Sequence, residues 1–542
     1  MRTSYAGRFA LLAIFIIQFV AVNKAVPSGD LPAQDRNASY SDGLPDWALL
    51  DPDMDGYEGV RTKTFYRYLQ TLDLIPERTD VIVGVIDSGF DIDHPDLAGN
   101  IWTNESEANG SPGVDDDNNG YVDDIHGWNF LGNAKYISYE VAREYKRLKD
   151  LKTPPTDAYY KKVKEEYEEK YDEVMSTYDG LKWTLKDLED AEKTLMQKNI
   201  TTDPEKLQGI SMTLKGKYSD AASVILGVYL LYGSKKSDVE QLLEKYEIKK
   251  AHLFDTTSTY LLVGDNPDDL FEKGYGNPDV DEKKESHGTH VAGIIASRQT
   301  GQAPFAKLML LRAVPNEGDE RDKDVANAIR YAVDNGASVI NMSAGKYFSP
   351  NPDIVVEAIR YAESKGVLFV VSAGNEGADA SKKINYPQKF IDSGSGKEYF
   401  SNMLVVGASS WMKQWDQDKD PKNQNSQFDL LAPFSNYSKE VVDVFAPGSQ
   451  INSTVPGGKY DYLSGTSMAA PVVSGIAAVL KSYYPALTAQ QLKQVIASSV
   501  RQYDKLMVKV RNKKDMYFSE LSKTGGVVDL LNAYRLAGTL SN

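Results

Sequence analysis

The sequence predicts an α/β protein with a doubly wound, mostly parallel sheet that is flanked by helices and carries a large all-helical insertion. From residue 80 onward, short apolar runs alternate with helical patterns. The runs are apolar on both faces, which is typical of strands in a buried parallel sheet. Strand and helix in alternation favour a doubly wound arrangement. The expected strands are residues 81–87, 307–314, 338–343, 367–374 and 403–409.

Helical patterns occupy the stretches between these runs. Residues 324–336 and 352–366 are the clearest, and each ends on a glycine, as helices often do. These helices are expected to cover the faces of the sheet.

The alternation stops between residues 131 and 277, where the chain becomes rich in tyrosine and charge. Apolar residues here recur in steps of three and four, which is the heptad spacing of packed helices. A helical hairpin or small bundle is expected, with a break at the prolines of residues 152–157 and two shorter helices further on. The seam positions are Tyr171, Val174, Tyr178, Leu181, Leu185, Leu188 and Leu195, and Glu192 occupies the one polar position.

Composition excludes several classes of protein. The formal net charge is −16, so the basic footprint of a nucleic-acid-binding protein is absent. The chain has no cysteine, which rules out a cysteine nucleophile, disulfides and thiolate metal sites.

The N-terminus has the pattern of a signal peptide. Arg2 and Arg8 precede an apolar run over residues 9–22, which is short for a membrane span. Cleavage after Ala25 would leave an exported protein, periplasmic or secreted, without a membrane span; an uncleaved anchor is the alternative. The expected organisation is a signal peptide at 1–25, the first part of the sheet domain at 26–130, the insertion at 131–277 and the rest of the sheet domain at 278–542.

Polar residues stand where functional groups gather in α/β proteins, at strand and helix ends. Asp87 ends the first strand, Asn375 follows a later one, and Ser467 begins a helix of small residues. A serine hydroxyl needs a base near neutral pKa, and that histidine needs a buried carboxylate. Asp87, His287 and Ser467 supply these types, and Asn375 offers an amide to a developing oxyanion. Taken singly, each could instead be a cap or turn residue.

His287 and His290 lie three residues apart, which raises the alternative of a zinc site. A zinc-binding helix of the H-E-x-x-H type needs histidines four apart with a glutamate between them. The stretch "HGTH" has neither feature, so we expect His287 to be a base and His290 a packed, hydrogen-bonded residue.

Four motifs in order resemble the subtilisin-like serine peptidases. They are "VIDSG" with "HPDL" around Asp87, "HGTHVAG" from His287, "SAGNEG" around Asn375 and "GTSMAAP" around Ser467. The order Asp, His, Ser is that of subtilisin. The resemblance implies an endopeptidase that acts on polypeptide substrates through an acyl-enzyme. Asp87 would orient the base His287, Ser467 would be the nucleophile and Asn375 an oxyanion donor.

The same resemblance implies a substrate cleft. Ser343, Ala344 and Gly345 resemble the family strand that pairs with substrate backbone, and Ala373 and Gly374 resemble one wall of the primary specificity pocket. The rival interpretation is an inactive scaffold of this fold that binds peptides. An α/β-hydrolase esterase is excluded, because that fold requires G-x-S-x-G and the order Ser, Asp, His.

The loop from Asp115 matches the first half of a calcium-binding EF-hand loop. The expected ligands are Asp115, Asp117, Asn119, the carbonyl of Tyr121 and Asp123, with His126 where that loop has a bidentate glutamate. A structural Ca²⁺ is therefore the one expected cofactor, with no organic cofactor. The alternative is a solvated acidic turn. Asp96 resembles a family calcium ligand, but its partner loop is short here, so local hydrogen bonding is the other expectation.

Two further expectations concern whole segments. About fifty residues separate the signal region from the first strand, so no separate inhibitory pro-domain is expected. The insertion lies between Asp87 and His287, and either a lid that restricts access to Ser467 or a surface decoration fits that position.

Overall fold

The computed structural model describes residues 44, 46–73, 76–232, 235–255, 262–382, 384–389, 398–413, 429–511 and 515–540. The predicted signal peptide, residues 1–25, lies outside them. The described chain forms two compact units. One is Val141–Thr256, and the other consists of Gly43–Glu140 and Thr257–Asn542.

A nine-stranded sheet is the centre of the second unit, in the order β10-β13-β7-β6-β5-β4-β1-β3-β2. All paired strands are parallel except β10 and β13. The five predicted strands are adjacent in it, which confirms the predicted fold class. They are β1 (Ile82–Asp87), β3 (Lys307–Arg312), β4 (Val339–Met342), β5 (Leu368–Ser372) and β6 (Met403–Ser409). The sequence did not predict β2 (Gly127–Asn129), β7 (Val444–Pro447), β10 (Arg501–Gln502) or β13 (Gly526–Val527).

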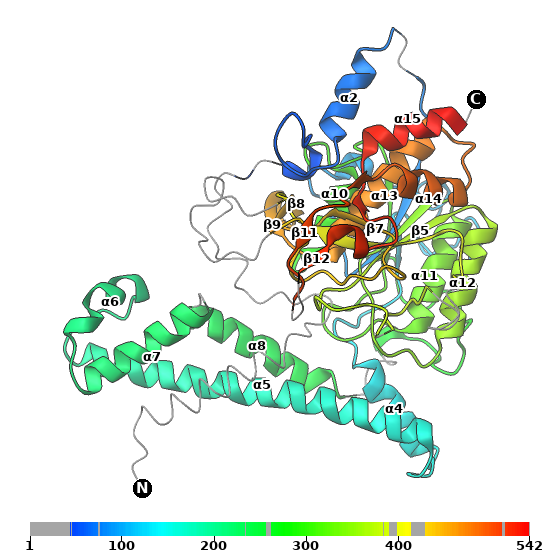
Figure 1. The fold of residues 1–542 in the computed structure, drawn as a ribbon. Coiled ribbons are helices and arrows are strands. Elements are labelled where there is room, and N and C mark those ends of the chain that lie inside the picture. The colour runs from blue at the N-terminus through cyan, green and yellow to red at the C-terminus, as the bar shows by residue number, and fades with distance from the viewer. Residues whose placement is uncertain are drawn as a thin grey trace. The chain divides into compact units, whose positions relative to one another are not determined.

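Helices cover both faces of this sheet (Figure 1). Val83 and Val85 of β1 pack into a core with α10 (His287–Ala296) and α13 (Thr466–Tyr483). Ile86 points to the other face, where α11 (Asp322–Asp334) and α12 (Pro352–Ser364) form a second core. Strand side chains alternate between faces, so a strand covered on both sides must be apolar throughout.

Shorter elements complete this unit. On the first core lie η2 (Trp47–Leu49), α2 (Thr62–Gln70), α14 (Ala489–Ser498) and α15 (Leu530–Leu540). The others are η3 (Ala98–Asn100), α3 (Glu105–Ala108), the hairpin β8 (Ile451–Val455) and β9 (Lys459–Leu463), the pair β11 (Met507–Val508) and β12 (Met516–Tyr517), and η5 (Phe518–Glu520).

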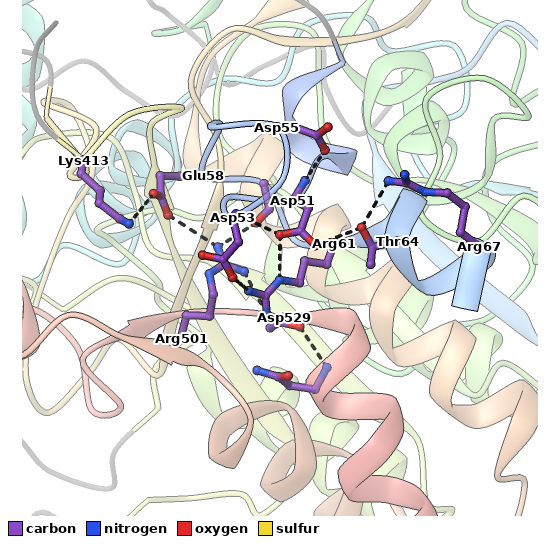
Figure 2. A network of polar contacts seen from close by, with 12 residues as sticks. Asp51, Asp53, Asp55, Glu58, Arg61, Thr64, Arg67, Lys413, Arg501 and Asp529 are labelled. Carbon is purple, nitrogen blue, oxygen red and sulfur yellow. Dashed lines mark hydrogen bonds and ion pairs between the residues drawn. The ribbon is translucent and has the colours of Figure 1, made fainter. Parts of the chain in front are cut away.

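The segment before β1 is bound to the C-terminal part of the chain by a network of ion pairs (Figure 2). Arg61 donates to Asp51 Oδ1 (3.2 Å) and to Asp529 Oδ2 (3.0 Å), and it also pairs with Asp53. Arg501 donates to the same Asp529 oxygen at 3.0 Å. The Asp529 side chain is fully buried, so both arginines neutralise a charge that has no access to water. The leading segment is therefore an integral part of the sheet unit.

The other unit is helical, as predicted for this region. A long helix, α5 (Ala158–Met196), packs against α7 (Lys217–Tyr232) and α8 (Lys236–His252). The remaining helices are α4 (Glu140–Asp150), α6 (Pro204–Ile210) and η4 (Ser211–Thr213). The predicted break falls between α4 and α5, where Asp157 caps α5 by accepting from Tyr160 N–H.

The predicted heptad seam of α5 is largely the buried face of that helix. Val174, Tyr178, Leu188 and Leu195 are buried, whereas Tyr171 is 40% exposed. Glu192, the polar seam position, accepts from Lys236 Nζ of α8 at 3.0 Å. The seam thus tolerates one charge because a lysine of the neighbouring helix neutralises it.

Residues on either side of the helical unit belong to the core of the sheet unit. Leu131, Ala134 and Ile137 pack there on one side, and Val263 and Tyr275 on the other. The compact helical unit is accordingly narrower than residues 131–277. None of the helices in the described ranges is long and apolar enough to cross a bilayer.

Candidate active site

Asp87 is the last residue of β1, at the carboxyl end of a central strand. Its carboxylate is buried, and Oδ1 accepts from the Ser88 N–H (2.8 Å) and from His287 Nδ1 (2.7 Å). Asp87 Oδ2 has no hydrogen-bond partner among the described residues. The contact joins two residues that are 200 positions apart in the sequence.

His287 is the first residue of α10. An ionised carboxylate only accepts, so Nδ1 carries the hydrogen and Nε2 keeps a lone pair for a proton. Burial is the largest single influence on the pKa of His287 and lowers it. The Asp87 charge, the Asp87 hydrogen bond and the Glu285 charge raise it and together prevail, so the net pKa lies above the ordinary histidine value. A side chain at Gly288 would lie 2.2 Å from the Gly89 carbonyl, so only glycine lets α10 approach the Asp87 loop this closely.

His290 has a different environment one turn further along α10. It is fully buried, and Nε2 donates to the carbonyls of Ile451 (2.9 Å) and Asp461 (3.1 Å). Burial lowers its pKa to about 3, which keeps the ring neutral. The described structure therefore places His290 in packing contact with β8 and β9, as the sequence predicted.

Ser467 is the second residue of α13, which packs against α10. Its Oγ donates to the Ser343 carbonyl (3.1 Å), and Ser343 Oγ donates to the Ser467 carbonyl (2.8 Å). No hydrogen bond joins His287 to Ser467 in the described part of the chain. Catalytic hydrogen bonds are often formed only when substrate is bound.

Asn375 and Gly465 define a small space beside Ser467. Asn375 Oδ1 accepts from the Thr466 N–H (2.8 Å), which leaves its Nδ2 as a donor. A Cβ on Gly465 would lie 3.5 Å from Ser467 N and 3.6 Å from Asn375 Nδ2. Two N–H donors thus flank one point, and glycine keeps that point open. The sequence predicted Asn375 here but not the part of Gly465, which depends on this three-dimensional proximity.

The predicted substrate-binding segments lie next to the same helix end. Ser343 contacts Ser467 as described, with Ala344 and Gly345 following it at the end of β4. Gly374 N–H donates to Thr466 Oγ1 at 3.1 Å. Asn436 Nδ2 donates to the Ala373 carbonyl (3.0 Å), and Asn436 N–H to the Gly374 carbonyl (3.0 Å). Asn436 thus holds residues 373–374, the segment predicted to form a wall of the specificity pocket. Sequence reasoning did not identify Asn436.

The acidic loop brings together only part of the predicted ligand set. Carboxylate oxygens of Asp115, Asp117 and Glu107 lie within 4.8 Å of one another. Glu107 was not predicted; its carboxylate also accepts from the N–H groups of Asp116, Asp117 and Asp123.

The other predicted ligands of this loop make local contacts. Asp123 carboxylate oxygens accept from Gly113 N–H at 3.0 and 2.9 Å. Asn119 Oδ1 accepts from the Tyr121 N–H at 2.8 Å. These bonds hold the loop in a tight turn around the acidic group.

Asp96 has an arginine as its neighbour. Arg298 Nε donates to Asp96 Oδ1 and the Gln299 N–H donates to Asp96 Oδ2, both at 3.2 Å. The local hydrogen bonding that the sequence offered as one expectation is therefore present at this carboxylate.

Several known proteases are similar to part of this chain. Thermophilic serine proteinase of Bacillus sp. (strain AK1) is 37% identical over 219 residues, which are 39% of this chain and 47% of that protein. Thermitase of Thermoactinomyces vulgaris is 37% identical over 212 residues, 38% of this chain and 64% of that protein. Major intracellular serine protease of Bacillus subtilis (strain 168) is 36% identical over 216 residues, 38% of this chain and 59% of that protein. The chain thus spans about half to two thirds of the length of these relatives.

One solved structure, of a cold adapted subtilisin-like serine proteinase, matches with 28% identity and a TM-score of 0.34, over 46% of this chain and 76% of that one. A sequence model of the subtilase family matches residues 78–515, which is most of the chain and includes Asp87, His287, Asn375 and Ser467. The chain belongs to the subtilase family.

Proposed function

We propose that the protein is a serine endopeptidase that hydrolyses peptide bonds of polypeptides through an acyl-enzyme. The observation that carries this proposal is the partly buried 2.7 Å hydrogen bond between His287 Nδ1 and Asp87 Oδ1. It fixes the tautomer that a base needs, on a helix packed against α13, whose second residue is Ser467. Two of the relatives are named as a serine proteinase and a serine protease, which supports the same reaction.

Each residue has a step in the proposed mechanism. His287 Nε2 takes the proton of Ser467 Oγ as this oxygen attacks the scissile carbonyl carbon. Asp87 stabilises the imidazolium, and the protonated His287 then gives its proton to the leaving amine. The carbonyl oxygen, now negative, enters the space kept open by Gly465, where Ser467 N–H and Asn375 Nδ2 donate to it. Water then attacks the acyl-enzyme. His287 takes a proton from this water and returns it to Ser467 Oγ.

Substrate backbone would be held beside the nucleophile by residues 343–345, with the side chain before the scissile bond against Ala373 and Gly374. This placement follows from the contacts of both segments with residues 466–467. The side chains that surround this pocket would determine which substrate residue it prefers.

Active-site labelling tests the proposal directly. A fluorophosphonate probe should label the wild-type protein at Ser467, and Ser467→Ala should abolish labelling while circular dichroism remains native. Folded wild-type protein that neither reacts with the probe nor cleaves a denatured protein substrate would favour the alternative, a peptide-binding scaffold without activity.

We further propose that the acidic loop holds a structural Ca²⁺. The donors are hard oxygens, the preferred ligands of this ion, and three carboxylates so close together repel one another until a cation neutralises them. Asp115, Asp117 and Glu107 would bind it, completed by Asn119, Asp123 and the Tyr121 carbonyl. The ion would supply stability to the loop and no chemistry to the reaction.

Thermal unfolding with and without calcium tests this site. Calcium at 100 times its Kd should stabilise the fold by about 2.7 kcal/mol. Asp117→Asn should remove most of the calcium-dependent shift in Tm, and Asp93→Asn, on an exposed carboxylate elsewhere, should not. Identical melting curves in calcium and in EGTA would contradict the proposal.

Export is also a proposal, supported by Arg2, Arg8 and the apolar run at residues 9–22. Expression in the native host followed by N-terminal sequencing should find a mature chain that begins near residue 26 outside the cytoplasm. A cytoplasmic chain that retains residues 1–25 would overturn it.

A further inference from the structure

One end of the helical unit is formed by the end of α5, by α6 and η4, and by the start of α7 (Figure 1). These pieces are packed together, because Leu195 and Leu207 are buried in one core of this unit. Lys217 Nζ of α7 also donates to Gln197 Oε1, directly after α5, at 2.7 Å. Residues 193–217 therefore form one packed surface, which we call the α6 end.

Positive charge gathers on the α6 end. Its two carboxylates are already engaged, because Asp203 accepts from the Lys206 N–H at the start of α6 and Glu205 lies 3.9 Å from Lys235. The lysines of this end are all exposed, and none of them forms an ion pair with a carboxylate among the described residues. They are Lys193, Lys198, Lys206, Lys215 and Lys217. The α6 end thus carries an excess of positive charge in a chain whose formal net charge is −16.

Three apolar side chains of the α6 end face water. Met212 is 100% exposed, Met196 is 59% exposed and Ile210 is 38% exposed. Single exposed apolar residues are common on protein surfaces, but here each has a lysine of the α6 end before and after it in the sequence. A fully exposed side chain such as that of Met212 lines no groove. The surface therefore combines protruding apolar groups with unpaired ammonium groups.

The surface of an anionic lipid bilayer matches this combination. Apolar side chains of a peripheral protein enter the boundary between headgroups and acyl chains, and lysines around them attract anionic lipids. Each lysine near such a surface strengthens binding by about fivefold. The rest of the chain is acidic, but its repulsion is screened beyond about 8 Å at physiological salt. An acidic protein would need a pocket for each protruding side chain, whereas a bilayer accepts them in any arrangement.

We propose that the α6 end binds the surface of an anionic lipid bilayer, with Met196, Ile210 and Met212 in the headgroup layer. The lysines around them contact lipid phosphates, and their aliphatic stems lie along the apolar side chains. The protein lies on the bilayer at this end and does not cross it there. The inference goes beyond the proposed function and does not depend on it, because no residue of the candidate active site belongs to residues 193–217.

Sedimentation with lipid vesicles tests the inference. The chain begins at residue 26, because the apolar run at residues 9–22 would itself bind any bilayer, and this removes no described residue. Ser467→Ala in every sample prevents self-cleavage. Vesicles of phosphatidylcholine alone are compared with vesicles that also contain about 30% phosphatidylglycerol, and binding to the anionic vesicles should be at least about tenfold tighter. Raising the salt from about 0.1 M to about 0.5 M should remove most of this difference.

Matched variants then assign the binding to the α6 end. Lys206→Gln with Lys215→Gln should weaken binding to the anionic vesicles by about 25-fold, since each lysine contributes about fivefold. Met212→Gln should weaken it by about tenfold, because an apolar side chain no longer leaves water. Met54→Gln with Lys63→Gln is the control, since it changes an exposed methionine and an exposed lysine of the sheet unit, and it should leave the affinity unchanged. Circular dichroism checks that each variant is folded.

Three results would overturn the inference. One is equal affinity for neutral and anionic vesicles, or binding to neither. Another is an unchanged affinity in the folded double lysine variant or in Met212→Gln. The third is a chain that ignores vesicles but binds labelled polyglutamate through the same lysines in fluorescence anisotropy, because the α6 end would then be a docking site for an acidic protein. All these measurements use the Ser467→Ala form, so they stand or fall separately from the proposed peptidase activity.

Discussion

Two opposing influences act on the pKa of His287, and their balance predicts how the activity depends on pH. Burial lowers this pKa and the Asp87 carboxylate raises it, with a net value above the ordinary 6.5. The base is active only when neutral, so kcat/KM should fall as pH drops through a midpoint above 6.5. Asp87→Asn removes the charge that raises the pKa, so this midpoint should move to lower pH, with kcat reduced by about 10⁴-fold. The measurement is the pH profile of kcat/KM.

The control for this shift is a carboxylate of the same loop that faces water. Asp93 is 74% exposed and pairs with Lys283, so Asp93→Asn should leave the acid midpoint in place. An unmoved midpoint in Asp87→Asn would show that the group titrating in catalysis is not His287.

The residues of the predicted catalytic centre could be named from residue types and their order, because a serine nucleophile requires a histidine base and a carboxylate. Asp87, His287 and Ser467 are recognisable from their own neighbours in the sequence. Glu107, Asn436 and Gly465 are not, because each acts through contacts with residues outside its own sequence motif. Asn436, for example, bonds a carbonyl 63 positions earlier, and no local pattern encodes that partner.

The buried ion pair between Arg312 and Glu282 lies between the Asp87 loop and the segment that precedes His287. Arg312 of β3 is in register with Asp87 of β1, and its Nε donates to the Ser88 carbonyl at 2.8 Å. Its NH2 group pairs with Glu282 at 3.4 Å, five residues before His287. The arginine thus joins the Asp87 loop to the segment that leads into α10.

Arg312→Met should therefore damage both stability and turnover. The free energy of unfolding should fall by about 3–5 kcal/mol, because the Glu282 carboxylate is left buried without its ion-pair partner. A small displacement of His287 from Asp87 should lower kcat by about 10- to 100-fold with little change in KM. Denaturant unfolding and steady-state kinetics measure the two effects.

A double variant separates these two effects. Arg312→Met with Glu282→Gln removes the stranded charge, so stability should return toward wild type while kcat stays low. Lys146→Met, which breaks the exposed pair with Asp150, should cost at most about 1 kcal/mol and leave kcat unchanged. A double variant with wild-type kcat would refute a positioning role for Arg312.

Element length explains which parts of the fold the sequence could predict. The five apolar runs and the two helical patterns that end on glycine are long enough to be recognised in the sequence. The structure contains a strand or helix at each of them. The missed strands β2, β7, β10 and β13 have two to four residues, too few to show a period; β4 also has four, but it was recognisable as part of the longer run of residues 338–343. β2, for example, pairs with the longer strand β3.

At the scale of the whole molecule, the sheet unit holds both ends of the helical insertion by its own contacts. On the outgoing side Lys346 bonds Glu140 at 2.6 Å. On the returning side Asp265 pairs with Arg321 and Lys323, each at 3.0 Å. The two sides also meet, because Asn133 N–H donates to the Leu262 carbonyl at 3.1 Å. Sequence reasoning set wider boundaries, since residues 131–140 and 262–277 lack the strand and helix periodicity of the rest of this unit.

Replacing Val141–Thr256 and the residues up to 261 by a flexible linker should therefore leave a folded sheet unit. Eight glycine and serine residues span up to about 28 Å, enough to join ends that are held near one another. Turnover of a small peptide should stay within about twofold of the full chain, because Asp87, His287, Asn375 and Ser467 all lie in the sheet unit. Loss of peptide turnover in a variant with native circular dichroism would contradict this independence. The same two enzymes on a folded protein substrate then distinguish a lid, whose removal raises the rate, from a surface decoration, whose removal leaves it unchanged.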